Sequence, residues 1–316
     1  MITSKLTSDY IRVKVSKLIR SARANKPFIS HAQILEDVVL WRALKNVKNG
    51  FYVDIGANSP MRHTTTRAFY ERGWRGVNVD PVEEWHKQHK RHRPRDTNIR
   101  VAISDTKDRR PFYVVPNSGC SSLIEKNAKN NDSGVRPRAH EITVETLTLS
   151  DLFSQYVQKA TVHFLKIDVE GSEDRVLQGM NFAKYRPWIV LVESACSSPD
   201  NHNHHLWEQS LLDVDYHFAY ADGLNRFYVA KEHSHLMKSL RYPPNVYDHY
   251  VSRAHYEREK KQHNVYFLAF GLFFIFHSFP KYIIAYWALV NAWQLRYKIG
   301  TTFGYLRAYL PLGATH

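Results

Sequence analysis

One stretch, residues 51–60, constrains this chain of 316 residues more than any other. It begins with three apolar residues that lead into an acid, Asp54, and a turn of small residues follows, including Gly56 and Asn58. A segment with helical composition then covers residues 65–72. A glycine in such a turn lets the backbone approach a ligand closely, and the helix beyond it offers free N–H groups. The stretch predicts a strand, a tight turn and a helix arranged around a ligand.

The next predicted strand, residues 76–80, also ends in an acid, Asp80, and this position suits the two hydroxyls of a ribose. A dinucleotide fold favours G-x-G-x-x-G in the first turn, whereas this turn has only Gly56. An acid before the turn would repel a pyrophosphate but attract the ammonium group of a methionine moiety. The sequence therefore favours S-adenosylmethionine as the cofactor. The alternative is that Asp54 only caps the turn and that Asp80 is an ordinary surface acid.

Acidic residues end four of the predicted strands: Asp54, Asp80, Asp168 and Glu193. Glu170 follows Asp168 in the predicted strand-to-helix turn. The carboxyl ends of parallel strands meet at one edge of a sheet, and doubly wound folds place their chemistry there. We therefore expect an α/β fold with a mostly parallel sheet, in which these carboxylates converge.

The third strand of this sheet is predicted over residues 99–104, where Ala102 and Ile103 would contact the adenine base. A loop rich in Asn, Ser and Gly, residues 117–134, contains Ser121 and is typical of a lid or a substrate grip. A mobile surface insertion is the alternative for this loop.

Two further strands, residues 216–220 and 226–230, are joined through Asp222 and Gly223, which is a hairpin signal. We expect this hairpin to close the sheet with an antiparallel edge. Asn225 lies in the same turn, and both polar side chains have a purely structural alternative as turn residues.

Six ordered blocks of this chain resemble the FkbM family of S-adenosylmethionine-dependent methyltransferases. The resemblance covers about residues 30–231, and the blocks are Gln33 with Glu36-Asp37, residues 51–60, residues 66–76, residues 165–171, residues 186–190 and residues 222–228. The resemblance implies a Rossmann-like class I methyltransferase fold and O-methylation, commonly of a sugar hydroxyl. Members often have glutamate at the end of the second strand, where this chain has Asp80.

For such an enzyme the methyl group is already activated, so the protein mainly aligns a hydroxyl and helps to remove its proton. We assign cofactor binding to Asp54, Gly56, Asn58, Asp80, Ala102, Ile103 and Asp168. We assign acceptor orientation or proton removal to Asp168, Glu170 and Glu193. We assign substrate binding to Asp222, Asn225 and Ser121. No metal is expected, although an ion held by Asp168 and Glu193 is an alternative.

The net charge of +14 belongs to the two ends of the chain. Residues 1–50 hold ten Lys and Arg against three acids, and residues 251–316 hold eight against two. Residues 9–26 predict a basic amphipathic helix, which suits an anionic membrane surface or, equally, a solvated position on the domain. We accordingly expect three parts: an N-terminal helix in residues 1–29, the methyltransferase domain in residues 30–238 and a helical tail in residues 239–316.

The tail contains two aromatic-rich apolar segments, residues 265–276 and 282–290, with basic residues after them. Each is shorter than the roughly 18 to 20 apolar residues that a membrane span needs. The pattern predicts an in-plane membrane anchor or re-entrant hairpin, and the alternative is a helical hairpin that joins two subunits. Nucleic acid fits poorly, because the basic residues stand beside bulky apolar segments.

Two cysteines, Cys120 and Cys196, give neither a disulfide framework nor a metal spacing, so a reducing compartment is expected. The N-terminus has no long apolar core of a secretory signal. These features predict a cytoplasmic enzyme, peripheral on the inner face of a membrane, that methylates a sugar hydroxyl of a glycan or lipid-linked saccharide. Two alternatives are methylation of a lipid or small-molecule hydroxyl and a non-catalytic domain that binds a glycan or recruits partners at a membrane surface.

Overall fold

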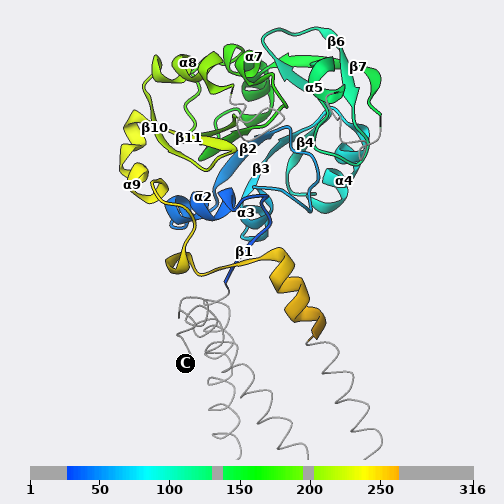
Figure 1. Cartoon of the computed structure of the whole chain (residues 1–316). Coiled ribbons are helices and arrows are strands. Elements are labelled where there is room, and N and C mark those ends of the chain that lie inside the picture. Colours follow the sequence, from blue (N-terminus) through cyan, green and yellow to red (C-terminus); the bar gives the residue numbers. More distant parts are fainter. Residues whose placement is uncertain (1–26, 130–137, 195–202, 263–316) are drawn as a thin grey trace, which may run out of the picture. The chain divides into compact units, whose positions relative to one another are not determined.

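The computed structural model describes residues 27–129, 138–194 and 203–262, and the chain divides into two units, one ending at Val251 and one beginning at Ser252. A seven-stranded sheet in the order β10-β11-β9-β8-β2-β3-β4 forms the centre of the first unit (Figure 1). Its strands are β2 (Phe51–Ile55), β3 (Arg75–Val79), β4 (Thr97–Ile99), β8 (Phe164–Ile167), β9 (Ile189–Glu193), β10 (Tyr216–Ala221) and β11 (Asn225–Ala230). The mostly parallel α/β sheet that the sequence predicts is present.

The predicted hairpin is confirmed as β10 and β11, which pair in antiparallel fashion. β11 also pairs in antiparallel fashion with β9, whereas β2 pairs in parallel with β3 and β8, β3 with β4, and β8 with β9. β11 therefore lies one place inside the edge, and the edge strand β10 runs in the direction of β9. We expected an antiparallel edge, but the antiparallel strand is β11, which is the second strand from the edge.

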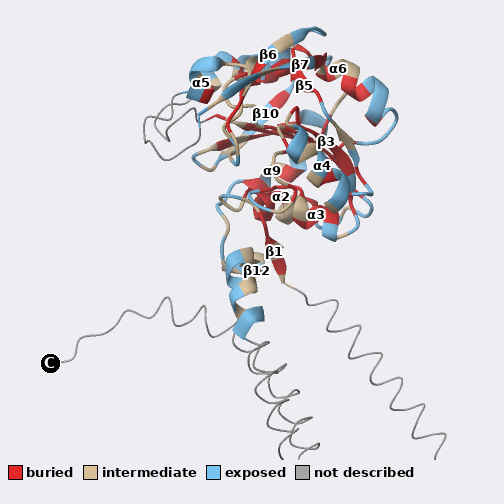
Figure 2. Cartoon of the chain, turned by 90° about the vertical axis from the view of Figure 1, so that its right-hand side faces the viewer, coloured by how far each residue is buried: buried red, intermediate tan, exposed pale blue. Residues whose placement is uncertain are grey.

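Side chains of the strands alternate between two hydrophobic clusters because successive residues of a strand point to opposite faces. On β2, for example, Val53 and Ile55 belong to one cluster and Tyr52 belongs to the other. Burial of each such aliphatic side chain stabilises the fold by roughly 1.5 to 3 kcal/mol relative to exposure. Figure 2 shows these buried residues concentrated on the strands and on the adjoining sides of the helices.

Helices complete both clusters. The first cluster takes residues from α6 (Leu149–Leu152), the π-helical turn η1 (Phe153–Val157), α7 (Glu173–Gln178) and α8 (Glu208–Leu212). The second takes residues from α2 (Glu36–Leu44), α3 (Arg67–Glu71), the 3-10 turn η3 (Lys231–Leu236) and α9 (Met237–Leu240). On α4 (Glu83–His92) only His89 is buried, and the other residues are half-buried or exposed. The sheet is thus covered by helices on both faces.

The prediction of a single third strand over residues 99–104 is wrong. β4 ends at Ile99, and a separate strand, β5 (Ala102–Ser104), pairs in parallel with β7 (His140–Thr148). β7 also pairs in antiparallel fashion with β6 (Arg109–Val114), which gives a small sheet in the order β5-β7-β6. The helix α5 (Glu125–Lys129) lies in the segment predicted as a loop. The chain changes sheet after Ile99 because β5 finds its partner about 40 residues later in the sequence.

The first unit continues past Lys238, where we expected the domain to end. Leu240 is fully buried, and the Arg42 guanidinium bonds Asp248 at 2.6 Å and the carbonyl oxygen of Tyr242 at 2.8 Å. A two-stranded sheet joins β1 (Phe28–Ser30) with β12 (Tyr250–Ser252). Two 3-10 turns, η2 (His204–Leu206) and η4 (Val246–Asp248), complete the described elements of this unit.

Most of the predicted N-terminal helix and both apolar segments of the tail lie outside the described residues. Of the second unit, residues 253–262 are helical. Within the described part of the chain, no helix combines the length and the apolar character that crossing a membrane requires.

Candidate active site

The turn after β2 is held by a close contact with the end of β8. Gly56 has φ +75°, and its N–H donates to the carbonyl oxygen of Val79 at 3.0 Å. A Cβ added to Gly56 would lie 1.7 Å from the backbone oxygen of Asp168, so only glycine fits at this position. The predicted tight turn is confirmed, and it brings the ends of β2, β3 and β8 together.

A pocket lies at this edge of the sheet, in front of the turn. Seven residues assigned to a site from the sequence line it: Gly56, Asn58, Asp80, Ala102, Ile103, Ser121 and Asp168. Its walls also include residues that sequence reasoning missed, among them Pro81, Val82, Trp85, Phe112 and Leu123. Phe112 and Leu123 come from the small sheet and the segment after it, so the insertion between β5 and β8 closes one side of the pocket.

Asp80, an acid in the wall of the pocket, is held in place by two backbone hydrogen bonds. One carboxylate oxygen accepts from the N–H of Asn58 and the other from the N–H of Val82, each at 2.8 Å. Asp80 is only 7% exposed, and burial raises its pKa to about 7. Both oxygens keep further lone pairs, so a hydroxyl-bearing ligand can still donate to this carboxylate.

Asp54 does not line the pocket but lies behind the turn, fully buried. Its Oδ2 accepts from the Thr66 hydroxyl at 2.9 Å, and its Oδ1 has no hydrogen-bond partner among the described residues. Burial raises the pKa of Asp54, and Lys166 and Thr66 oppose that shift. Asn58, which lines the pocket with φ 45°, likewise keeps a buried side-chain oxygen without a partner in the described chain.

Lys166 connects the buried acid to the pocket. It stands opposite Asp54 in the pairing of β2 with β8, and its ammonium lies 3.8 Å from Asp54 Oδ1 and 2.8 Å from Asp168 Oδ2. Burial alone would raise the pKa of Asp168, but the Lys166 charge and hydrogen bonds from Glu193 and Lys166 outweigh it and lower this pKa. The Asp168 side chain keeps 30% exposure, so this ionised acid can meet a ligand.

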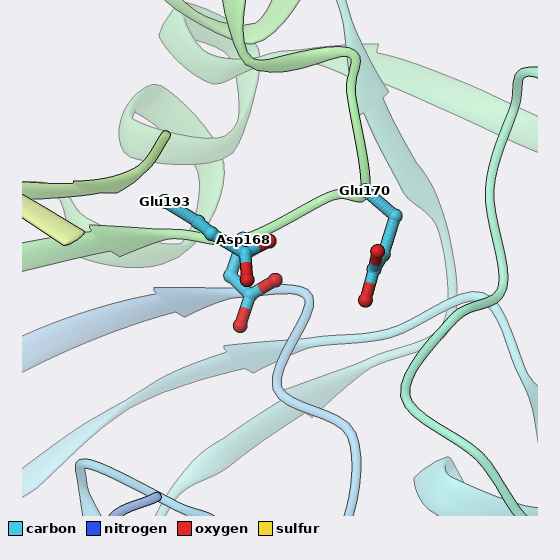
Figure 3. Close-up of side chains that lie close together, drawn as sticks. All are labelled: Asp168, Glu170 and Glu193. Carbon is cyan, nitrogen blue, oxygen red and sulfur yellow. The ribbon is translucent and has the colours of Figure 1, made fainter. Parts of the chain in front are cut away.

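Asp168, Glu170 and Glu193 converge as the sequence predicts, with carboxylate oxygens within 4.8 Å of one another (Figure 3). Figure 3 shows the Asp168 and Glu193 carboxyl groups side by side and Glu170 extending from the turn after β8. Burial, together with the charge of Asp168, raises the pKa of Glu193 well above its usual value. The raised pKa favours the protonated form of Glu193, which donates a hydrogen bond to Asp168. The spacing of the three acids would also accommodate a metal ion.

Glu170 is held in a backbone conformation that is unusual for a side chain of its kind. Its φ is 57°, and its carbonyl oxygen accepts from Ser122 Oγ at 2.9 Å and from Asn127 Nδ2 at 2.8 Å. A non-glycine residue with positive φ is uncommon and is often found at functional sites. The segment containing Ser122 and Asn127 thus fixes the turn that carries Glu170, a role for the predicted lid segment that the sequence did not show.

The proposed substrate residues lie in different places. Ser121 lines the pocket, and its hydroxyl accepts from the N–H of Val115 at 3.0 Å. Asp222 accepts from the N–H of Asn225 at 2.6 Å within the hairpin turn. Asn225 stands opposite Glu193 in the pairing of β11 with β9, so the hairpin turn adjoins the acidic cluster but not the pocket.

Comparison with known proteins agrees with this geometry. The model of the methyltransferase FkbM domain matches residues 54–218, which is more than half of the chain and includes Asp54, Asp80, Asp168 and Glu193. No curated protein matches the chain. The match begins at the first acid of the site and ends inside β10, so it covers the pocket, the acidic cluster and the insertion between them. The family predicted from the sequence motifs is confirmed, and this chain belongs to the FkbM methyltransferase family.

Proposed function

We propose that this methyltransferase transfers a methyl group from S-adenosylmethionine to a hydroxyl of a sugar, in a glycan or a lipid-linked saccharide. In this proposal the seven-stranded sheet is a Rossmann-like class I methyltransferase fold. The observation that carries the proposal is the pocket at the strand ends, where the well-anchored Asp80 faces the same space as the ionised Asp168.

The residues present fit this cofactor. Val79, Val101, Ala102 and Phe112 give the pocket apolar walls for an adenine base, and Asp80 offers acceptors for ribose hydroxyls. The unpartnered oxygen of Asn58 and the ionised Asp168 can accept from an ammonium group. Asp54 does not line the pocket; it accepts a hydrogen bond from Thr66 and adds negative charge next to the pocket wall.

When bound, the cofactor supplies an activated methyl group. The chain then has to orient the acceptor hydroxyl and receive its proton. We assign this task to Asp168, because it is ionised and its side chain stays partly exposed. Glu193 and the ammonium of Lys166 both donate hydrogen bonds to Asp168 and so orient its carboxylate.

A sugar is the favoured acceptor because the neighbourhood of Asp168 is rich in groups that bind hydroxyls. Glu170 and Glu193 offer carboxyl oxygens within the cluster, and Asn225 lies beside Glu193 on the adjoining strand. Several hydroxyls of one ring could be bound at once by such groups. We propose no metal for this site, because Lys166 already neutralises Asp168 and the raised pKa of Glu193 opposes its ionisation.

At about pH 8 or above, where Asp80 is ionised, its replacement by asparagine should weaken the binding of S-adenosylmethionine by about 10- to 100-fold, since hydrogen bonds to a charged group are worth roughly 1.5 to 3 kcal/mol. Isothermal titration calorimetry of the wild type and Asp80→Asn measures this effect. Asp222→Asn is the matched control, because it makes the same change in the hairpin turn outside the pocket.

The control variant should bind the cofactor as tightly as the wild type does. A folded wild type that binds no S-adenosylmethionine would overturn the proposal. Equal losses in Asp80→Asn and Asp222→Asn would remove the assignment of Asp80.

We also propose that the tail holds the enzyme at an anionic membrane surface on the cytoplasmic side. The other outcome of the test below is that the same segment joins two subunits. The support is the sequence of residues 265–316, which combines Trp, Tyr and Phe with basic residues. A chain ending at Val251 tests this, because it keeps the Arg42–Asp248 ion pair and the buried Leu240.

The truncated protein should lose co-sedimentation with vesicles that contain anionic lipid, while the full chain keeps it. The number of subunits per particle, obtained from the mass measured by light scattering, should equal that of the full chain in detergent. A smaller number of subunits with unchanged vesicle binding would assign the tail to subunit association instead.

A further inference from the structure

Lys166 is a buried cation that the proposed chemistry does not use directly. It is 6% exposed, at the centre of β8, and its ammonium lies between the carboxylates of Asp54 and Asp168. Glu36, on α2, also acts on it electrostatically. A buried lysine is costly unless it is paired, so its presence beside the pocket requires an explanation.

The charges of Asp54, Asp168 and Lys166 can be counted. The ammonium of Lys166 favours the ionised form of both acids. With both carboxylates ionised, this group of three carries a net charge of about −1. Asp168 and Gly56 line the pocket, which places this net charge at the wall of the ligand space.

The two forms of the cofactor respond differently to that charge. S-adenosylmethionine carries a sulfonium, an ammonium and a carboxylate, for a net charge of +1. S-adenosylhomocysteine, its product, has lost the sulfonium charge and is neutral overall. The two share the adenosine and the amino-acid end, so a nearby protein charge changes their relative affinity mainly through the sulfonium.

We propose that Lys166 is a positioning and specificity residue that sets how strongly the pocket prefers the charged methyl donor over its uncharged product. This inference rests on the proposed function. Without Lys166 the two carboxylates would stabilise the sulfonium more strongly in the ground state. Methyl transfer removes that positive charge, and stabilisation of the ground state that is lost in the transition state slows the chemical step. Lys166 limits this excess while its bond to Asp168 keeps that carboxylate oriented.

Three variants separate the charge of Lys166 from a structural role. Lys166→Met removes the positive charge at nearly constant shape. Asp168→Asn removes one negative charge. The double variant removes both partners of the Lys166–Asp168 ion pair and restores the net charge of about −1, which Asp54 then carries alone.

The measured quantity is the ratio of the dissociation constants of S-adenosylhomocysteine and S-adenosylmethionine, obtained by calorimetry for each protein. Lys166→Met should raise the ratio on the order of ten-fold, as a unit charge acting across roughly 10 Å at an effective dielectric constant of about 20 would do. Asp168→Asn should lower it by a similar factor, and the double variant should return it to near the wild-type value. Titrations at about pH 7 and about pH 9 are needed, because two buried carboxylates without the ammonium can retain a proton at the lower pH.

A purely structural role predicts a different result, since a disturbed pocket weakens both ligands alike and leaves the ratio unchanged. An unchanged ratio in Lys166→Met at both pH values would overturn the inference. If Lys166→Met does not fold, the step from Asp168→Asn to the double variant measures the same charge and should raise the ratio. A wild type that binds neither ligand contradicts the proposed function instead, so the two failures are distinguishable.

Discussion

Asp168→Asn should lower the rate of methyl transfer at saturating cofactor by at least about 100-fold, because proton removal by a positioned base typically contributes 10²- to 10⁴-fold. Asp168 is the ionised member of the acidic cluster, and it accepts hydrogen bonds from both Lys166 and Glu193. The measurement is transfer of radiolabelled methyl groups to saccharide acceptors and to membrane extracts of the source cells.

Glu193→Gln provides the matched control for this prediction. The glutamine amide can donate to Asp168 as the protonated Glu193 does, so we expect the rate to fall by less than about ten-fold. If Glu193→Gln abolishes transfer while Asp168→Asn retains it, Glu193 is the base and the roles of the two residues are exchanged.

Gly56→Ala should abolish cofactor binding and lower the free energy of unfolding by more than about 3 kcal/mol, since it combines overpacking with backbone strain. The new Cβ would lie 1.7 Å from the Asp168 carbonyl oxygen, and φ +75° disfavours every residue with a side chain. The turn and the end of β8 would have to separate, which moves Asp168 away from Asn58 and Asp80.

Gly73→Ala is the control for this effect. Gly73 has φ +91°, but an added Cβ would meet no atom within 4 Å. Its replacement therefore causes backbone strain but no steric clash. It should lower the free energy of unfolding by about 1 to 2 kcal/mol and leave cofactor binding unchanged. Chemical denaturation and calorimetry measure the two quantities, and an equal effect of both substitutions would contradict the close contact at Gly56.

The acids at the strand ends were predictable because the carboxyl end of a buried strand can be recognised in the sequence, as the position where a run of apolar residues ends. Asp80, Asp168 and Glu193 all stand at such ends, and parallel pairing then brings them to one edge. Asp54 shows the limit of this argument. Its position on β2 was correct, but whether its side chain lines the pocket depends on the face of the sheet that it occupies.

The sequence analysis assigned no role to Lys166, although the period of a strand places it on the same face as Asp168. Its contact with Asp54 could not be predicted, because it depends on the register of β2 against β8. β7 was missed despite a usable signal, the β-branched run Ile142, Thr143, Val144, Thr146 and Thr148. The split of the third strand followed from the same omission, since β5 has no partner until β7 is recognised.

The most direct test of this account is the chemical identity of the methylated product. After reaction with labelled S-adenosylmethionine, the acceptor is hydrolysed to monosaccharides and analysed by mass spectrometry. We predict a methyl ether on a sugar oxygen in the wild-type reaction and its loss in Asp168→Asn. A label found on nitrogen or on a carboxyl oxygen, formed by a protein that binds the cofactor, would contradict the assignment of this site to sugar O-methylation.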